Sequence, residues 1–170
     1  MPERINSFPP VARADARVLV LGSMPGVASL RAGQYYAQPQ NRFWPIVAEL
    51  FAFEREAPYA TRLAALIDNR VALWDVLESC QRPGSLDSSI RRATARPNDF
   101  GRFFAHHPQI SAVFFNGKAA AELYRRLVLP TLAVGFQALH HATLPSTSPA
   151  NAGITPAAKL VAWRALKLAG

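Results

Sequence analysis

The chain of 170 residues contains a single cysteine, Cys80. One cysteine cannot form an internal disulfide, and it excludes a zinc or iron–sulfur site ligated by several cysteines. We therefore expect Cys80 to be a small packing residue. Apolar runs of membrane-spanning length are also absent, and the N-terminus lacks the basic-then-apolar pattern of a signal peptide. These absences predict a cytoplasmic protein with no membrane partner.

Acidic residues are scarce, because 11 Asp and Glu stand against 19 Lys and Arg, which gives a net charge of +8. The isoelectric point is near 10.6. Such a balance favours a polyanionic partner. Most of the basic residues are arginines, whose planar guanidinium matches the oxygens of a phosphate. An arginine-rich surface that serves solubility alone gives the same balance, so charge by itself does not establish nucleic-acid binding.

Motifs of several common enzyme classes are missing. No GK[ST] follows the loop GSMPG (residues 22–26), and neither GxGxxG nor the nucleophile motif GxSxG occurs. The histidines form two adjacent pairs, and the side chains of adjacent residues diverge in a helix or a strand. These pairs, His106 with His107 and His140 with His141, are therefore poor metal ligands. We expect no metal site and no cofactor.

Apolar runs alternate with helical patterns along the chain. The apolar runs predict strands at residues 17–22, 70–77 and 110–117, with a fourth within 138–144. The helical patterns predict helices over 41–53, 58–69, 118–129 and 155–169, and another that begins at Pro97. Residues 1–16, interrupted by Pro9 and Pro10, are expected to form an irregular lead-in to a single domain, 1–170. The sequence thus predicts an α/β fold, a three-layer α/β/α sandwich with a central, mainly parallel four-stranded sheet.

Four segments rich in glycine, proline, hydroxyls and amides follow the predicted strands. Ligands of open parallel sheets gather outside the carboxyl ends of the strands, so we expect these segments to line one cleft. They are GSMPG (22–26), WDVLESCQRPGSLD (74–87), NGK (116–118) and LPSTSPANAG (144–153).

Read together, GSMPG, YYAQPQNRFW (35–44), NGKAA and LPSTSPANA resemble the uracil-DNA glycosylase superfamily, from about Val18 to the last helix. The sequence is most similar to the hypoxanthine-DNA (deoxyinosine) glycosylase branch, with the mismatch-specific G:T/U glycosylases as neighbours. GxxPG alone is a weak signal, whereas GxxPG followed by an aromatic residue and then PxNRFW is specific. The resemblance implies a monofunctional DNA repair glycosylase that flips a deaminated base, here hypoxanthine, out of DNA and hydrolyses its N-glycosidic bond without a cofactor.

The resemblance also implies roles for residues near the first loop. Tyr36 matches the aromatic residue that stacks on the flipped base, with Tyr35 as a substitute, although both tyrosines could instead pack over the sheet edge. Met24 stands where many relatives carry an Asn or Asp that positions the attacking water, which a thioether cannot do. Asn41 is therefore expected to be catalytic, and its alternative role is to cap the following helix. The expected pocket wall is Gly22, Ser23, Met24, Pro25 and Gly26.

Two residues at strand ends, Asp75 and Asn116, are expected to contact the edge of the base. A side-chain amide complements both N1–H and O6 of hypoxanthine. An ionised Asp75 would accept from N1–H but repel O6, and it could instead orient water or pair with an arginine such as Arg82. The alternative for Asn116 is a turn that caps a helix.

The serine-rich loop near the C-terminus matches the second motif of the superfamily. Its hydroxyls and backbone amides suit the phosphates of DNA, or the stretch is an ordinary turn. The histidine that usually precedes the serine is replaced by Leu144 and Pro145. The expected DNA-backbone residues are Ser146, Thr147, Ser148 and Asn151.

Three alternatives to a monomeric hypoxanthine glycosylase stay open. The first is a uracil or G:T/U mismatch glycosylase on the same scaffold. The second is an inactive nucleic-acid-binding relative that lost its catalytic group at Met24. The third is a hydrolase of free nucleosides, which would not need a basic surface.

Overall fold

The structure is a computed structural model that describes residues 3–169. At its centre lies a sheet in the order β3–β2–β6–β7, in which all neighbouring strands are parallel. Its strands are β2 (Val18–Gly22), β3 (Val71–Asp75), β6 (Ala112–Asn116) and β7 (His140–Leu144). Every residue of β2 and β3 is buried, as expected for strands covered on both faces. The predicted four-stranded parallel sheet is confirmed.

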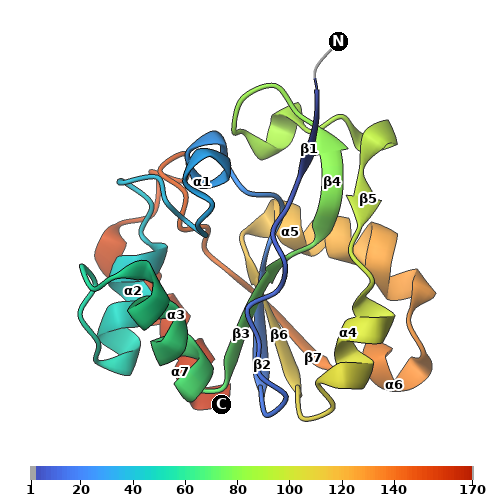
Figure 1. The fold of residues 1–170 in the computed structure, drawn as a ribbon. Helices are drawn as coiled ribbons and strands as arrows, with labels where there is room; N and C mark the ends of the chain where they lie inside the picture. Colours follow the sequence, from blue (N-terminus) through green and yellow to red (C-terminus); the bar gives the residue numbers. More distant parts are fainter. Residues whose placement is uncertain (1–2, 170) are drawn as a thin grey trace.

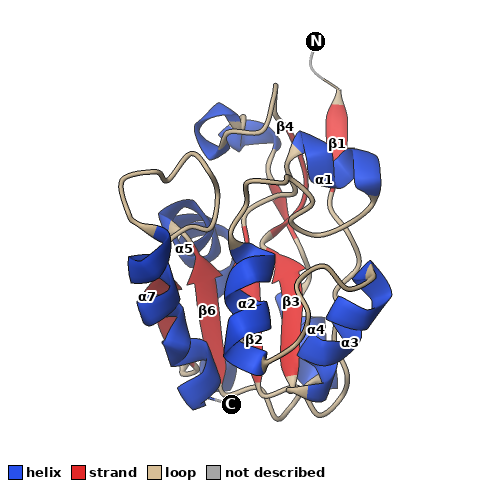
Figure 2. Ribbon diagram, turned by 90° about the vertical axis from the view of Figure 1, so that its left-hand side faces the viewer, coloured by secondary structure: helices blue, strands red, loops and turns tan. Residues whose placement is uncertain are grey.

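Helices cover both faces of this sheet, as the two views in Figures 1 and 2 show. One face carries α2 (Phe43–Phe51), α3 (Tyr59–Asp68) and α7 (Pro156–Ala169). The other carries α4 (Phe100–His106), α5 (Lys118–Leu123) and α6 (Val134–Gln137). Phe43 and Trp163 belong to the core on the first side, and Phe100 and Cys80 to the core on the second. The three-layer sandwich is therefore confirmed, and Cys80 is a packing residue.

A second, smaller sheet corrects the prediction of an irregular lead-in. β1 (Arg4–Asn6) pairs antiparallel with β4 (Leu77–Gln81), which pairs on its other side with β5 (Arg96–Pro97). Val11 also forms a bridge with Leu73 of β3. Outside β1 and this bridge, residues 3–16 contain no helix or strand. The sequence did not reveal β1 because a three-residue strand is too short to carry an alternating pattern, and its pairing partner lies far along the chain.

The predicted strand 70–77 is two strands. The backbone N–H of Val76 donates to the carbonyl of Gly22 (2.8 Å), and the chain then leaves the central sheet to enter β4. The helix expected to begin at Pro97 begins instead at Phe100, where Asp99 caps it by accepting from the N–H of Arg102 (3.1 Å). Pro97 belongs to β5.

Two helical regions also differ from prediction. The helix expected over 118–129 has α geometry only in α5, and it continues as a π-helical turn (Tyr124–Val128) and a 3₁₀ turn (Leu129–Thr131). A short helix, α1 (Val27–Ala32), follows the GSMPG loop and was not predicted, because six residues carry too little periodicity. Two further 3₁₀ turns (Asp87–Ser89 and Arg92–Thr94) occur between β4 and β5.

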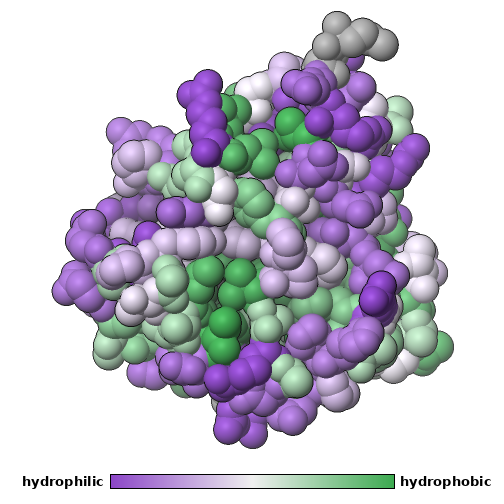
Figure 3. All heavy atoms as spheres, in the orientation of Figure 1, coloured by the Kyte–Doolittle hydropathy of each residue, from purple (hydrophilic) through white to green (hydrophobic). Residues whose placement is uncertain are grey.

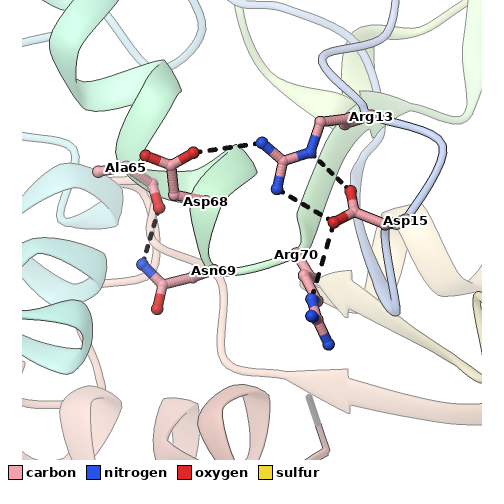
Figure 4. A network of polar contacts seen from close by, with 6 residues as sticks. All are labelled: Arg13, Asp15, Ala65, Asp68, Asn69 and Arg70. Atoms are coloured by element: carbon pink, nitrogen blue, oxygen red, sulfur yellow. Dashed lines mark hydrogen bonds and ion pairs between the residues drawn. The ribbon is translucent and has the colours of Figure 1, made fainter.

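A network of charged side chains lies at the amino ends of β2 and β3 (Figure 4). Arg13 Nε lies 2.7 Å from Asp15 Oδ1, and Arg13 Nη1 lies 3.3 Å from Asp68 Oδ1. Arg70 Nε approaches Asp15 Oδ2 at 3.7 Å. Exposed ion pairs of this kind add little stability. They lie at the opposite end of the strands from the loops that were expected to form a site.

The face seen in Figure 1 carries hydrophilic residues around most of its rim, with smaller apolar areas between them (Figure 3). Across residues 3–169, none of the helices has the length and apolar character needed to span a bilayer.

Candidate active site

A pocket of about 330 Å³ opens at the carboxyl ends of β2, β3 and β6. The chain passes from β2 to β3 on one side and then to β6 on the other, so the pocket lies where the strand order reverses. All four segments expected to converge contribute to its lining. Among the lining residues are all those predicted for catalysis and for the base pocket: Gly22, Ser23, Met24, Pro25, Gly26, Tyr36, Asn41, Asp75 and Asn116.

The serine-rich loop forms one rim of the pocket. Ser146, Thr147 and Ser148 line it, whereas Asn151 does not. The Asn151 side chain instead donates to the carbonyl of Ser146 (3.1 Å). Asn151 therefore supports this loop from outside the pocket lining.

Asn116 holds the same loop through two hydrogen bonds. Its Nδ2 donates to Thr147 Oγ1 (2.9 Å), and its Oδ1 accepts from the Thr147 N–H (2.9 Å). The Thr147 carbonyl in turn accepts from the N–H of Arg42 (3.0 Å), which joins the loop to the start of α2. An amide has two N–H donors and two oxygen lone pairs, so Asn116 keeps one of each for a ligand.

Asn41 lies where the chain enters α2. Its Oδ1 accepts from the N–H of Phe43 (2.9 Å), so the side chain stabilises the helix start while it lines the pocket. Within residues 3–169 no hydrogen-bond partner engages its Nδ2, which leaves the amide N–H group for a ligand. Because an amide is not basic at neutral pH, Asn41 can position water or a base but cannot remove a proton.

The two neighbouring tyrosines occupy different environments. Tyr35 is 3% exposed, and its hydroxyl donates to the carbonyl of Pro9 (3.0 Å), which anchors it in the core. The ring of Tyr36 stacks on that of Phe43, with centroids 4.1 Å apart and an angle of 27° between the planes. Tyr36 has a φ of 55°, a conformation that bulky residues rarely adopt and that is concentrated at ligand sites.

Asp75, the last residue of β3, is the buried carboxyl of the pocket. It is 3% exposed, and its Oδ2 has no hydrogen-bond partner in the described part of the chain. Burial, and to a lesser extent the negative charge of Asp87, raise the pKa of Asp75 to about 7 against the opposing effect of Arg82. The Tyr36 hydroxyl, which also lacks a described partner, shares this buried region.

Arg82 does not pair with Asp75, as the sequence had allowed. The guanidinium is 4% exposed and donates to the carbonyls of Gly84 and Pro25, both at 2.7 Å. Its Nη1 lies 3.5 Å from the carbonyl of Met24. Arg82 therefore joins the segment after β4 to the GSMPG loop, and within residues 3–169 no cation is bonded to Asp75.

Some lining residues, among them Ser85, Leu86 and Asp87, were not singled out from the sequence. The hydroxyl of Ser85 accepts from the N–H of Val27 (2.9 Å), and the carboxylate of Asp87 accepts from the hydroxyl of Ser23. Their segment was expected to converge on the site. These individual contacts join loops that are far apart in the sequence, however, so no local sequence pattern could have predicted them.

The site is therefore built from amides, hydroxyls, aromatic rings and one buried carboxyl. Residues 3–169 contain no cluster of three or more His, Cys, Asp or Glu side chains arranged to hold a metal ion. Met24 is 6% exposed and adds apolar surface to the pocket wall. Such a set can stack on a ring, bind its edge and position water.

Comparison with known proteins agrees with this arrangement. A profile described as the uracil DNA glycosylase superfamily matches residues 9–167. A protein of Methanosarcina acetivorans named hypoxanthine DNA glycosylase is 35% identical over 147 residues, which are 86% of this chain and 87% of the relative. A protein of Methanosarcina barkeri with the same name is 36% identical over 118 residues, which are 69% of this chain and 73% of the relative.

A solved structure extends the similarity to the whole fold. The solution NMR structure of a candidate uracil DNA glycosylase from Methanosarcina acetivorans superposes with a TM-score of 0.78 at 31% identity, and the match covers 97% of this chain and 99% of that one. Because the profile, the relatives and this structure all span most of the chain, the protein belongs to the uracil DNA glycosylase superfamily.

Proposed function

We propose that the protein hydrolyses the N-glycosidic bond of deoxyinosine in DNA and so releases hypoxanthine. The observation that carries the proposal is the convergence of Tyr36, Asn41 and Asp75 on one pocket at the strand ends. Both curated relatives are named for this activity. The pocket volume of about 330 Å³ falls within the range of about 300–1,000 Å³ that is usual for small-molecule sites.

The chemistry follows from the groups that line the pocket. Tyr36, backed by Phe43, offers a ring on which a flipped base stacks, an interaction worth about 1–3 kcal/mol. The free N–H group of Asn41 holds the attacking water or an acceptor of the base near the sugar. The remaining donor and acceptor of Asn116 suit the O6 and N1–H of hypoxanthine. Water then adds to C1′ of the oxocarbenium-like sugar as the base leaves.

The serine-rich loop suits the DNA backbone. Ser146 and Ser148 carry hydroxyls at the rim of the pocket, and Asn116 and Asn151 hold the loop in place. The net charge of +8 adds a general attraction to phosphates. Contacts of this kind position a duplex without reading its sequence. We expect the protein to act as a monomer, which light scattering of the protein alone and with DNA would test.

A panel of labelled duplexes tests the substrate. Each duplex carries one deoxyinosine, deoxyuridine, deoxyxanthosine or mismatched thymidine, and base release is followed under single-turnover conditions. Release of hypoxanthine faster than uracil or thymine supports the proposal. Uracil or thymine release alone assigns the protein to a neighbouring activity of the superfamily. Salt-sensitive DNA binding without any release indicates an inactive relative.

A further inference from the structure

Asp75 lies in the pocket with Tyr36 and Asn41, but the chemistry proposed above gives its carboxyl no role. Its carboxyl is 3% exposed and lines the pocket, and Oδ2 has no hydrogen-bond partner in residues 3–169. A buried carboxyl without a partner is costly, above all when it is ionised. A group of this kind at the end of a strand, inside a ligand pocket, is a candidate for direct chemistry.

The surroundings of Asp75 favour its protonated form. Burial is the larger cause, and Asp87, on the 3₁₀ turn after β4, acts in the same direction by placing a second negative charge near it. Arg82 is the one cation near enough to oppose them among the described residues, but its hydrogen bonds go to backbone carbonyls. The neighbouring hydroxyls of Tyr35 and Tyr36 are neutral, because burial raises their pKa values well above 10. Burial, Asp87 and Arg82 together set the pKa of Asp75 at about 7.

A neutral carboxyl matches the electronic demand of the departing base. Negative charge develops on the purine as its bond to the sugar breaks, and a carboxylate beside it would repel that charge. An O–H donor stabilises it instead. The Hoogsteen edge of hypoxanthine presents N7 and O6, both acceptors, as the same edge of guanine does.

We propose that Asp75 is the general acid of the reaction and donates its proton to N7 of the departing hypoxanthine. The proposal rests on the proposed function. The C1′–N9 bond breaks, its electron pair stays on the purine, and the proton from the Asp75 carboxyl moves to N7, so that neutral hypoxanthine leaves. Water adds to C1′, and the proton that it loses restores the acid form of Asp75. Asn41 positions the water, and Asp75 activates the leaving group.

The test is the pH profile of single-turnover hypoxanthine release from a deoxyinosine duplex, for wild type and three Asp→Asn variants. The wild-type rate should be level below about pH 7 and fall about tenfold per unit above it. Asp75→Asn should lower the rate at pH 6 by about a hundredfold or more and flatten the profile. Asp99→Asn, at the exposed cap of α4 where Asn caps equally well, should behave as wild type.

The variant Asp87→Asn separates a chemical role of Asp75 from a structural one. It keeps an oxygen to accept from Ser23 but removes the charge that raises the Asp75 pKa. The midpoint of the profile should therefore move to lower pH. This shift does not depend on whether Asp75→Asn folds.

The outcomes distinguish the two proposals. A wild-type rate that rises through pH 7, a wild-type rate in Asp75→Asn, or an unmoved midpoint in Asp87→Asn overturns the general acid while hypoxanthine release stands. The absence of hypoxanthine release from wild type at every pH overturns the proposed function, and the general acid with it.

Discussion

Gly22 lies beside Asp75 in the register between β2 and β3, and a Cβ on Gly22 would stand 2.6 Å from Asp75 Oδ1. The same Cβ would stand 3.0 Å from the hydroxyl of Tyr36. The lack of a side chain at Gly22 therefore gives the buried carboxyl and the tyrosine hydroxyl their space beside β2. Two of the groups in the proposed reaction depend on this one position.

Gly22→Ala should accordingly impair both folding and base release. The added methyl group has to displace Asp75 and Tyr36, and overpacking of this kind costs about 1–3 kcal/mol of stability. We expect base release to fall by about tenfold or more, because small misplacements of reacting groups are costly. Single-turnover rates and urea denaturation measure the two effects.

Gly26→Ala is the matched control in the same loop. Its Cβ would lie 3.5 Å from Ser85 Oγ, an ordinary contact, and its φ of −72° suits alanine. Equal losses of activity in the two variants would contradict the role given to the space beside Gly22.

Thr147→Val should loosen the serine-rich loop. Valine has nearly the same shape but no hydroxyl, so Nδ2 of Asn116 loses its acceptor. We expect a loss of about 0.5–1.5 kcal/mol in stability and weaker DNA binding. Denaturation and fluorescence anisotropy with a labelled duplex measure both, and Thr147→Ser, which keeps the hydroxyl, should retain DNA binding near wild type. Identical behaviour of the two variants would show that this hydrogen bond does not hold the loop.

Arg82→Met should disorganise the GSMPG loop. Methionine fills much of the same volume but leaves the buried carbonyl of Pro25 without its donor, at a cost of about 1–3 kcal/mol. Lysine keeps the positive charge but lacks the several N–H donors of the planar guanidinium. Arg82→Lys should therefore recover only part of the loss. Hydrogen exchange of the amides in the loop reports its order. Full recovery by lysine would show that charge, rather than the hydrogen bonds, is what matters at this position.

The stability of the protein should fall as pH rises towards neutral because of Asp75. Its ordinary pKa of 3.8 is raised to about 7 by folding, so the folded state retains a proton that the unfolded state loses. The folded state is therefore disfavoured progressively between these two values, by on the order of 4 kcal/mol in total. Above pH 7 the effect should level off.

Asp75→Asn removes this dependence, because asparagine does not titrate. Urea denaturation from pH 4.5 to 8.5 should show the variant gaining stability relative to wild type as pH rises. A difference between the two proteins that is independent of pH would contradict the raised pKa.

Most of the fold could be predicted from the sequence because the strands of the central sheet are short and largely apolar, and three of them end in or next to glycine, asparagine or proline. The run from Val18 to Gly22 has this character, and it predicted both a buried strand and a site at its end. β1 and the place of Asp87 could not be predicted in the same way. Both depend on contacts between segments far apart in sequence, with Cys80 in one case and Ser23 in the other.

Asn41 shows the limit of such predictions for function. The sequence allowed either a helix cap or a catalytic amide, and the structure gives it a capping hydrogen bond and a place in the pocket at once. The two polar atoms of its side chain have different roles, since Oδ1 stabilises α2 and Nδ2 is left for a ligand. Only the arrangement in space could reveal that the two interpretations are compatible.

Release of hypoxanthine by wild type, Asn41→Asp and Asn41→Ala from one deoxyinosine duplex tests the central claim most directly. Aspartate keeps the oxygen that accepts from the Phe43 N–H but lacks the amide N–H group, so Asn41→Asp should fold as wild type and yet release base at least about a hundredfold more slowly. Asn41→Ala should lose activity and also about 1 kcal/mol of stability. Wild-type rates of hypoxanthine release in Asn41→Asp, or no release by the wild-type protein, would contradict the account.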